Sequence, residues 1–197
     1  YTTLFRSMSG PFASTGRQIE AAAKLYMAEH GTEVAGREIE LVVKDDAGVA
    51  DTTKRLAQEL IVRDKVAVIA GFGLTPLALA AAPLATRAKV PEIVMEAATS
   101  SITEQSPYVV RTSYTTPQVT SKIADWAKAN GIGKVVTLVS DYGPGIDAEK
   151  TFQQVFSEAG GEVLDSLRAP LANPDFAPFL QKVADVGGRP EGDAGTV

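Results

Sequence analysis

Apolar positions along the chain alternate between helical spacing and strand spacing. From residue 15 to residue 27 they recur every three or four positions, and Gly31 supplies a helix stop. Residues 38–44 alternate polar and apolar side chains before an apolar stretch, as a half-covered strand does. The acidic turn Asp45-Asp46 follows, and Asp51 is placed to cap a second helix. The side chains that these two helices are expected to bury are Ile19, Ala22, Ala23, Tyr26 and Met27, and then Leu56, Ala57, Leu60 and Ile61.

The alternation continues to the end of the chain. Short apolar strands are predicted at residues 66–70, 91–95 and 108–112. Two helices open on a Thr-Pro pair, Thr75-Pro76 and Thr116-Pro117, where proline suits the first helical position. The second of these helices is expected to turn Val119, Ile123, Trp126 and Ala127 inward. Further on, the pattern predicts a strand at 134–140, a turn at 141–145, a helix around Phe152 to Ala159, a strand at 162–168 and a helix at 175–186.

Strands that alternate with helices of this length predict βαβ units, parallel sheets and an α/β fold. Polar turn residues at 113–117 divide the pattern into two lobes, residues 1–115 and 116–197. The second lobe has two clear strands, too few for a complete parallel sheet, and its tail at 187–197 has almost nothing to bury. Arg6 interrupts residues 1–7, which makes that segment atypical of a buried first strand and leaves open whether it is native.

Composition narrows the choice of partner. The chain has 197 residues, 45% of them hydrophobic, with a net charge of -5. The acidic balance argues against nucleic acid or an anionic membrane as the main partner and favours a small molecule. No run approaches the roughly 18 apolar residues that span a bilayer. With no cysteine and one histidine, His30, the sequence cannot assemble a histidine-based triad or a zinc site of the usual ligands. His30 sits at a helix end, where a structural role is expected.

The turn at residues 96–103 is the first candidate site, because it follows the apolar run 93–95 and is rich in Ala, Ser and Thr. Small side chains let backbone N–H groups approach an anion where a strand ends, which predicts a seat for a carboxylate. An ordinary polar loop is the alternative. The helix that opens at Thr75 directs N–H groups and a hydroxyl to the same crevice. Gly71-Phe72-Gly73 before it is only a weak match to a dinucleotide loop, since Pro76 replaces the third glycine.

Two further turns carry alternatives. Tyr142 follows the strand at 134–140 and is either a buried ring with a hydroxyl partner or an aromatic cover for a ligand at a cleft. Asp45-Asp46 either caps the turn into the next helix or binds Mg²⁺ as paired carboxylates do in phosphotransfer receivers. We favour the cap.

Four segments have the order and spacing of one family. They are residues 9–16, 44–46, 96–99 and 141–145. Over roughly residues 8–186 the chain resembles the periplasmic leucine/isoleucine/valine-type binding proteins of ABC importers. The resemblance implies a type I periplasmic binding fold of two Rossmann-like lobes that close on a ligand, with the second lobe incomplete at its carboxyl end.

The resemblance also implies a function. The chain would be the substrate-binding component of an ABC importer, without enzymatic activity or cofactor, capturing a small carboxylate such as a branched-chain or other amino acid. It would act as a monomer with a membrane permease as partner. Its location would be periplasmic or otherwise extracytoplasmic, with a signal peptide in the precursor and a lipid anchor if the cell has a single membrane. The alternatives are a sensing domain of the same fold, or a binding protein for aromatic carboxylates or amides.

The site residues follow from the same resemblance. The carboxylate and amine of an amino acid would be held by the turn at Ala97, Ala98 and Thr99 and by the turn at Leu74 and Thr75. The family's aromatic residue from the first loop falls at Thr15, with Phe12 of the same loop as its candidate replacement, and the aromatic residue of the second lobe falls at Tyr142. The acidic residue that meets the ligand amine in this family has no counterpart before Val197.

Overall fold

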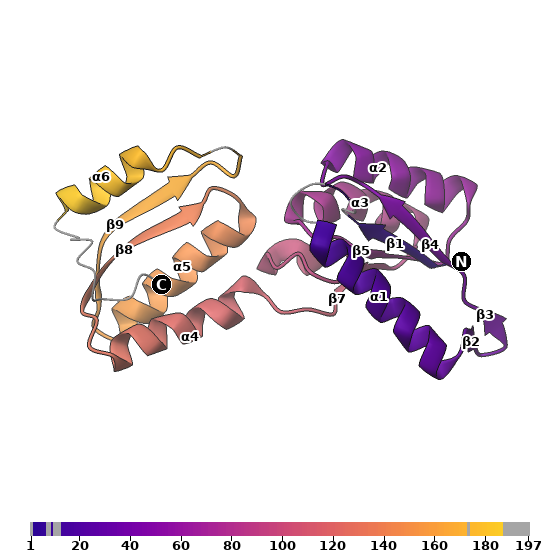
Figure 1. Ribbon diagram of the computed structural model, residues 1–197, viewed down its shortest axis with the longest axis horizontal. Coiled ribbons are helices and arrows are strands. Elements are labelled where there is room, and N and C mark those ends of the chain that lie inside the picture. Colours follow the sequence, from indigo (N-terminus) through magenta and orange to yellow (C-terminus); the bar gives the residue numbers. More distant parts are fainter. Residues whose placement is uncertain (1, 7–8, 10–12, 173, 187–197) are drawn as a thin grey trace. The chain divides into compact units, whose positions relative to one another are not determined.

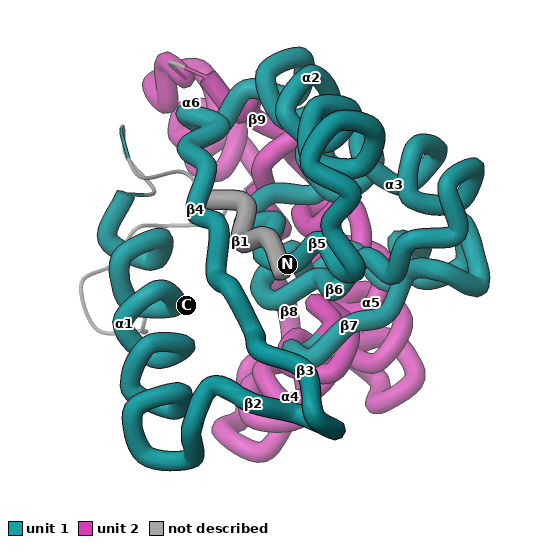
Figure 2. The backbone as a smooth tube through the Cα atoms, turned by 90° about the vertical axis from the view of Figure 1, so that its right-hand side faces the viewer, with its two compact units in different colours: residues 1–114 teal, residues 115–197 magenta. Residues whose placement is uncertain are grey.

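The chain folds into two compact units, coloured separately in Figure 2. The computed structural model describes residues 2–6, 9, 13–172 and 174–186. Unit 1 is Tyr1–Tyr114 and unit 2 is Thr115–Val197, so the division falls one residue before the boundary expected from sequence. Within the described residues, no helix is both long enough and apolar enough to cross a membrane.

Unit 1 is built on a five-stranded sheet whose paired strands all run parallel. The strand order is β4-β1-β5-β6-β7, so the first strand of the chain lies inside the sheet. The strands are β1 Thr2–Arg6, β4 Leu41–Asp45, β5 Val68–Gly71, β6 Glu92–Val94 and β7 Val109–Arg111. The parallel α/β fold predicted from the alternation is confirmed.

The segment that Arg6 makes atypical of a buried first strand is nevertheless a regular strand of the sheet. Residues 2–6 form β1, which pairs with β4 on one side and with β5 on the other. Arg6 is the last residue of the strand and lies in register with Asp45, the last residue of β4.

Helices cover both faces of this sheet, with α1 on one side and α2 and α3 on the other (Figures 1 and 2). Their bounds are α1 Ala13–His30, α2 Ala50–Gln58 and α3 Thr75–Ala88; α2 continues into a π-helical turn, η1 Glu59–Arg63, and a 3₁₀ turn, η2 Ser100–Glu104, follows β6. The main core lies on the α2 and α3 side, where Leu60, Ile69 and Leu77 are buried. Leu56 and Ala57 are buried as predicted, and Ile61 is partly buried.

Helix α1 buries fewer side chains than predicted. Gly16 is the one buried residue among those described in α1, and Tyr26 of the expected inward stripe is 63% exposed. The strand expected at residues 38–44 is also interrupted. It divides into β4 and β3 Arg37–Glu38, which pairs with β2 Glu33–Val34 in an antiparallel hairpin. Ala35 and Gly36 both have positive φ, as a two-residue hairpin turn that follows the strand twist requires.

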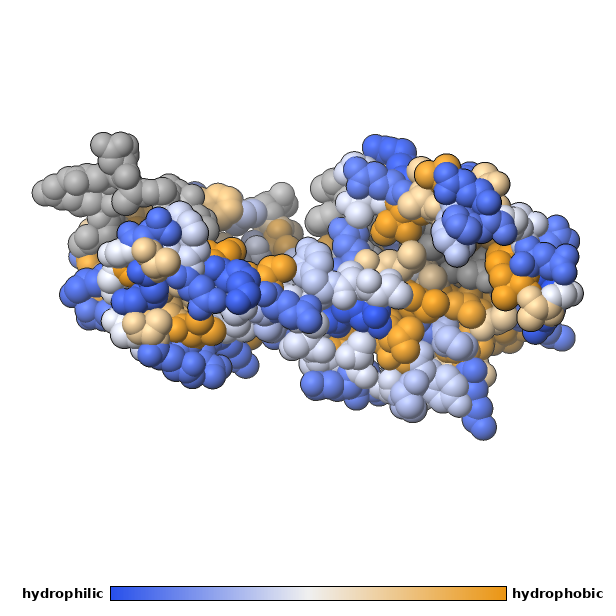
Figure 3. All heavy atoms as spheres, turned by 90° about the horizontal axis from the view of Figure 1, so that it is seen from below, coloured by the Kyte–Doolittle hydropathy of each residue, from blue (hydrophilic) through white to orange (hydrophobic). Residues whose placement is uncertain are grey.

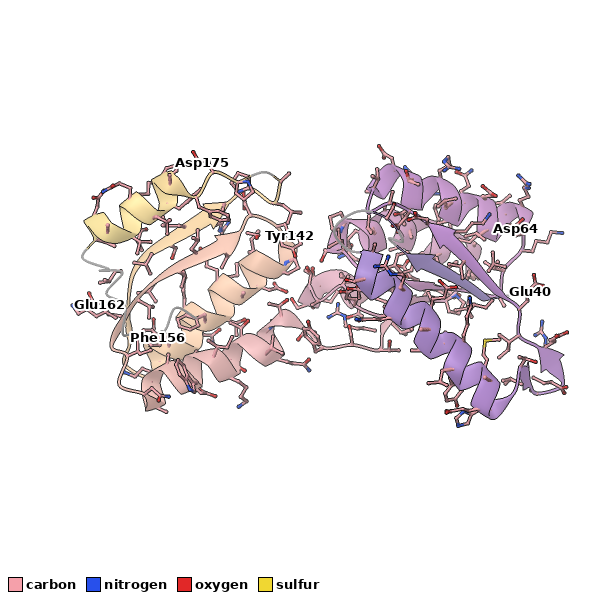
Figure 4. All side chains as sticks on the ribbon, viewed as in Figure 1. Glu40, Asp64, Tyr142, Phe156, Glu162 and Asp175 are labelled. Carbon is pink, nitrogen blue, oxygen red and sulfur yellow. The ribbon has the colours of Figure 1, made fainter. Side chains whose placement is uncertain are left out.

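Unit 2 contains a pair of parallel strands, β8 Lys134–Ser140 and β9 Glu162–Ala169, with a register irregularity between Val135 and Val136. Its helices are α4 Thr116–Ala129, α5 Gly143–Glu158 and α6 Ala177–Asp185. Helices α4 and α5 pack against each other, and Phe156 of α5, labelled in Figure 4, is fully buried beside Ala124 and Ala127 of α4. Thr115 forms a capping box with Gln118, which fixes the start of α4.

Helix α4 buries a different stripe from the predicted one. Ala127 is buried as predicted, but Val119, Ile123 and Trp126 are exposed, the last to 48%. Thr120 and Ala124 take the inward positions, one residue along from Val119 and Ile123. Small side chains at this contact let α4 approach α5 closely. The larger apolar groups are left at the surface, and apolar areas are visible on both units in Figure 3.

The segment expected as a turn at residues 141–145 is largely helical. Helix α5 begins at Gly143, and Gly145 lies buried in its first turn. A Cβ atom at position 145 would lie 1.9 Å from the backbone oxygen of Ser140, the last residue of β8. Helix α5 can therefore start directly against the strand end only because residue 145 has no side chain.

We predict that Gly145→Ala destabilises unit 2 by about 1–3 kcal/mol, the usual cost of overpacking, because a backbone atom cannot move aside as a side chain can. Chemical denaturation followed by circular dichroism measures the change. The matched control is Gly133→Ala, since a Cβ there meets nothing within 4 Å. Equal stability of the two variants would contradict the close approach of α5 to β8.

Glu92, the first residue of β6, carries a carboxyl group and is fully buried. Its neighbours in register are Ile69 of β5 and Val109 of β7, both buried apolar residues. Neither carboxyl oxygen has a hydrogen-bond partner within the described residues. Burial raises the pKa of Glu92 to about 8. The carboxyl group is therefore protonated and neutral in the folded chain at neutral pH.

This burial makes stability depend on pH. Because the folded pKa of Glu92 is about 8 and the ordinary value is 4.5, folding takes up a proton between these values, and stability falls as pH rises from about 4.5 to about 8. Glu92→Gln keeps the shape and removes the ionisation, so we predict that it is more stable than wild type at pH 9, by up to about 4 kcal/mol. Denaturant titrations at pH 5.5, 7.5 and 9 measure this, with exposed Glu104→Gln as control. Parallel pH profiles for Glu92→Gln and wild type would refute the prediction.

Candidate functional site

The carboxyl ends of the parallel strands in unit 1 form the candidate site. Strand β1 lies beside β5 in the sheet. From β1 the chain continues to β4 on one side of this pair, and from β5 it continues to β6 and β7 on the other side, so the strand order reverses between β1 and β5. Ligands of open α/β sheets bind outside the carboxyl ends of the strands at such a switch point. The segments that begin there are Phe72–Leu74 after β5 and Met95–Thr99 after β6.

Main-chain hydrogen bonds hold these two segments together. The N–H of Met95 donates to the oxygen of Gly71 at 2.7 Å, and the N–H of Ala97 donates to the oxygen of Phe72 at 3.0 Å. Phe72 has a φ of 64°, a left-handed conformation that is uncommon for a residue with a side chain. Its ring is fully buried in the core, and this burial offsets the conformational cost. The loop after β5 therefore has a fixed path next to the turn after β6.

Two threonine hydroxyls meet where these segments come together. The Oγ1 atoms of Thr75 and Thr99 lie 2.7 Å apart, and the two residues are only 5% and 6% exposed. Leu74 is the N-cap residue of α3 and makes no side-chain cap bond, so the expectation that Pro76 takes the first helical position was wrong. Thr75 is instead the first helical residue, and its hydroxyl pairs with Thr99 across the two loops. A pair of hydroxyls shares one hydrogen between its oxygens, which leaves the other O–H to donate elsewhere.

The other residues that the sequence predicted for the site in this unit differ in their burial. Ala97 is buried and Ala98 is half-buried, both in the turn between β6 and η2. Leu74 is half-buried and its side chain packs against the main core, so any part it takes in a site is through its backbone. Thr15 is half-buried in the first turn of α1, and Phe12 lies outside the described residues.

Tyr142 belongs to the other unit. It is half-buried at the N-cap position of α5, and its N–H donates to the oxygen of Ser140 at 2.8 Å (Figure 4). The tyrosine thus follows the carboxyl end of β8, in the position that Phe72–Leu74 takes after β5. Contact between Tyr142 and a ligand stays a prediction.

Two charged residues that the sequence did not single out contact the two segments at the strand ends. Arg111, the last residue of β7, donates a hydrogen bond from Nη2 to the backbone oxygen of Thr99. The carboxylate of Glu96 lies over Gly73, where an added Cβ would be 3.1 Å from Oε2. A sequence signal existed for Arg111, because it ends a strand with two valines before it. Nothing in the sequence indicated that Glu96 and Gly73 would be neighbours.

The acidic pair Asp45-Asp46 serves the turn into α2. Asp46 is fully buried and accepts hydrogen bonds from the N–H of Gly48 at 2.9 Å and from the hydroxyl of Thr53 at 3.2 Å. Asp45 accepts one from the N–H of Ala47 at 2.8 Å. The interpretation that this pair caps the turn before α2 is therefore confirmed. The expectation that Asp51 caps the helix itself was wrong, because the N-cap residue is Val49. No group of three or more potential metal-ligating side chains occurs among the residues that the structure describes.

His30 has the structural place that was expected. It is the last residue of α1, its Nδ1 lies 3.1 Å from the oxygen of Tyr26, and its ring stacks on the Tyr26 ring with centroids 4.1 Å apart. These contacts lie within the final turn of one exposed helix, far in sequence from the strand ends that make up the candidate site.

Comparison with known proteins identifies the fold and the family. The family model for periplasmic binding proteins matches residues 4–187. A curated relative, the Leu/Ile/Val-binding protein homolog 6 of Brucella abortus, is 49% identical over 181 residues, which are 91% of this chain and 46% of the relative. The chain thus spans about half the length of the curated relatives that it matches.

Solved structures agree with this assignment. A solute-binding protein of an ABC transporter from Rhodopseudomonas palustris BisB5, in complex with 3,4-dihydroxybenzoic acid, is 61% identical with a TM-score of 0.88. Another from R. palustris, in complex with 4-hydroxybenzoate, is 48% identical with a TM-score of 0.90. Each match covers 94% of this chain and 51% of the other. The chain therefore belongs to the periplasmic binding protein family, with the type I fold of its leucine/isoleucine/valine-type members.

Proposed function

We propose that this chain is part of the solute-binding component of an ABC importer and that unit 1 captures a small organic acid by its carboxylate. The observation that carries the proposal is the buried pair of hydroxyls on Thr75 and Thr99, 2.7 Å apart at the strand ends. Hydroxyl groups and the N–H groups of a helix start donate hydrogen bonds to anions. The site needs no metal, cofactor or catalytic base for this task, because binding a carboxylate is an exchange of hydrogen bonds with water.

The ligand that we favour is a hydroxylated benzoate. Relatives that are 61% and 48% identical were solved in complex with 3,4-dihydroxybenzoic acid and 4-hydroxybenzoate. Gly73, Ala97 and Ala98 at the strand ends carry no bulk, and Thr15 stands where the resemblance expects an aromatic side chain. The short side chains of Ala97, Ala98 and Thr15 support an acid that is bulkier than an aliphatic amino acid.

An amino acid is the second candidate, and the position of Glu96 favours it. The carboxylate of Glu96 precedes Ala97 directly and lies over Gly73, close to the proposed carboxylate seat. A ligand with an ammonium group beside its carboxylate could donate to Glu96 while the threonines hold the acid. The Brucella relative carries the name of a Leu/Ile/Val-binding protein homolog.

The remaining parts of the proposal come from the family. A membrane permease is the expected partner, the location is extracytoplasmic, and the protein acts as a monomer without nucleic acid. The comparisons give no support for a lipid anchor. A sensing domain of the same fold would bind the same ligand, and interaction with a permease separates the two.

Ligand binding is tested directly by calorimetry and thermal shift on the full chain with 4-hydroxybenzoate, 3,4-dihydroxybenzoate and leucine. We expect one class to raise the unfolding free energy, by about 2.7 kcal/mol when the free ligand is at 100 times its Kd. Stabilisation by a hydroxybenzoate alone supports the favoured ligand, and stabilisation by leucine alone supports the second candidate. No stabilisation by any of the three would overturn the proposal.

The threonine pair is tested by substitution. Thr99→Ala should weaken binding of the carboxylate by about tenfold to a hundredfold, the loss expected for one hydrogen bond to a charged group. Stability without ligand should fall by only about 1 kcal/mol, because the Thr75 hydroxyl loses its partner. Thr99→Ser should restore both quantities, and Thr103→Ala, an exposed position in the adjoining η2 turn, serves as the control. Unchanged affinity in Thr99→Ala would remove Thr99 from the site.

A further inference from the structure

The backbone of Thr99 is hydrogen-bonded to the guanidinium of Arg111. The backbone oxygen of Thr99 accepts a hydrogen bond from Nη2 of Arg111 and a second from the N–H of Ile102 at 3.3 Å. Arg111 reaches it from the neighbouring strand, since β7 pairs with β6 and Arg111 lies in register with Val94. The contact therefore crosses from the end of β7 to the turn that follows β6, and it fixes the backbone at the residue whose hydroxyl meets Thr75.

The charge of Arg111 is permanent and half-buried. A guanidinium stays protonated at any pH at which the protein is folded, and partial burial weakens the screening of its field by water. The hydrogen bond from Arg111 to the Thr99 oxygen brings this positive charge to the turn that carries the proposed seat. A carboxylate bound there is attracted by the guanidinium, whereas an uncharged group of the same shape is not.

We propose that Arg111 is the positioning residue of the carboxylate seat: it fixes the Thr99 turn and makes the seat select a carboxylate over an uncharged amide group of the same shape. This inference rests on the proposed function. A residue that only tied β7 to the turn would affect acids and neutral ligands equally, because both would use the same hydroxyls. A residue that sets the charge preference affects the acid alone.

The substitution Arg111→Gln separates the two roles, because glutamine retains an N–H donor for the Thr99 oxygen and loses the charge. The experiment measures, by calorimetry on the full chain, the Kd of an acid and of its amide. The pair is 4-hydroxybenzoate with 4-hydroxybenzamide if the protein binds the hydroxybenzoate, and leucine with leucinamide if it binds leucine. We expect Arg111→Gln to reduce the preference for acid over amide by at least about tenfold while the affinity for the amide stays within about threefold of wild type. The control Arg87→Gln, which removes an exposed charge from α3, should leave the preference unchanged.

Each outcome decides one question. If wild type binds none of the acids, the proposed function fails. If wild type binds an acid and Arg111→Gln leaves the acid-to-amide ratio unchanged, or weakens both ligands equally, the inference about Arg111 fails and the proposed function stands.

If Arg111→Gln no longer melts cooperatively, the same measurements are made on Arg111→Lys, which keeps the positive charge. In that variant, retention of the wild-type preference with a fall in acid affinity on addition of salt supports the inference. A preference lost although the charge remains overturns it.

Discussion

The parallel pairing of β5 with β1 on one side and β6 on the other is the constraint on which unit 1 depends. It brings the ends of these strands to one edge of the sheet, so that segments distant in sequence must share a small space. The bonds from Met95 to Gly71 and from Ala97 to Phe72 extend this pairing past the strands and into the loops. Once the loops are pinned, Thr75 and Thr99 have little freedom left, and their hydroxyls meet although 24 residues separate them.

Buried polar groups at the two ends of this sheet differ in whether they have hydrogen-bond partners among the described residues. At the carboxyl ends the buried threonines have partners, and the backbone of the turn is held by Arg111. At the start of β6, Glu92 is buried with no partner within the described residues for either oxygen, and burial raises its pKa. Glu92 lies at the amino end of β6, whereas the candidate site lies at the carboxyl ends of the strands. A ligand can exchange hydrogen bonds with the threonine hydroxyls at the carboxyl ends of the strands.

The strand and helix pattern of the chain could be predicted because it depends on local spacing. Residues 134–140 were expected as a strand and form β8, and the helix at Leu56 and Leu60 buries the side chains that its spacing indicated. Burial on α1 and α4 was predicted less well. Tyr26 and Trp126 have the right spacing for a core but lie at the surface. For Trp126 the reason is that close packing of α4 on α5 favours small residues such as Ala124. Spacing identifies an apolar stripe, but the partner helix decides which side of it is covered.

The site shows the same division. The sequence by itself determined that Ala97, Ala98 and Thr99 follow a strand, that a helix opens at Thr75, and that the chain resembles a family of binding proteins. Only the tertiary structure decided that the hydroxyls of Thr75 and Thr99 face each other, that Arg111 holds the turn from a third strand, and that Glu96 lies over Gly73. These contacts join residues from different strand ends. Local sequence specifies a strand and where it stops, whereas the order in which strands pair specifies which ends become neighbours.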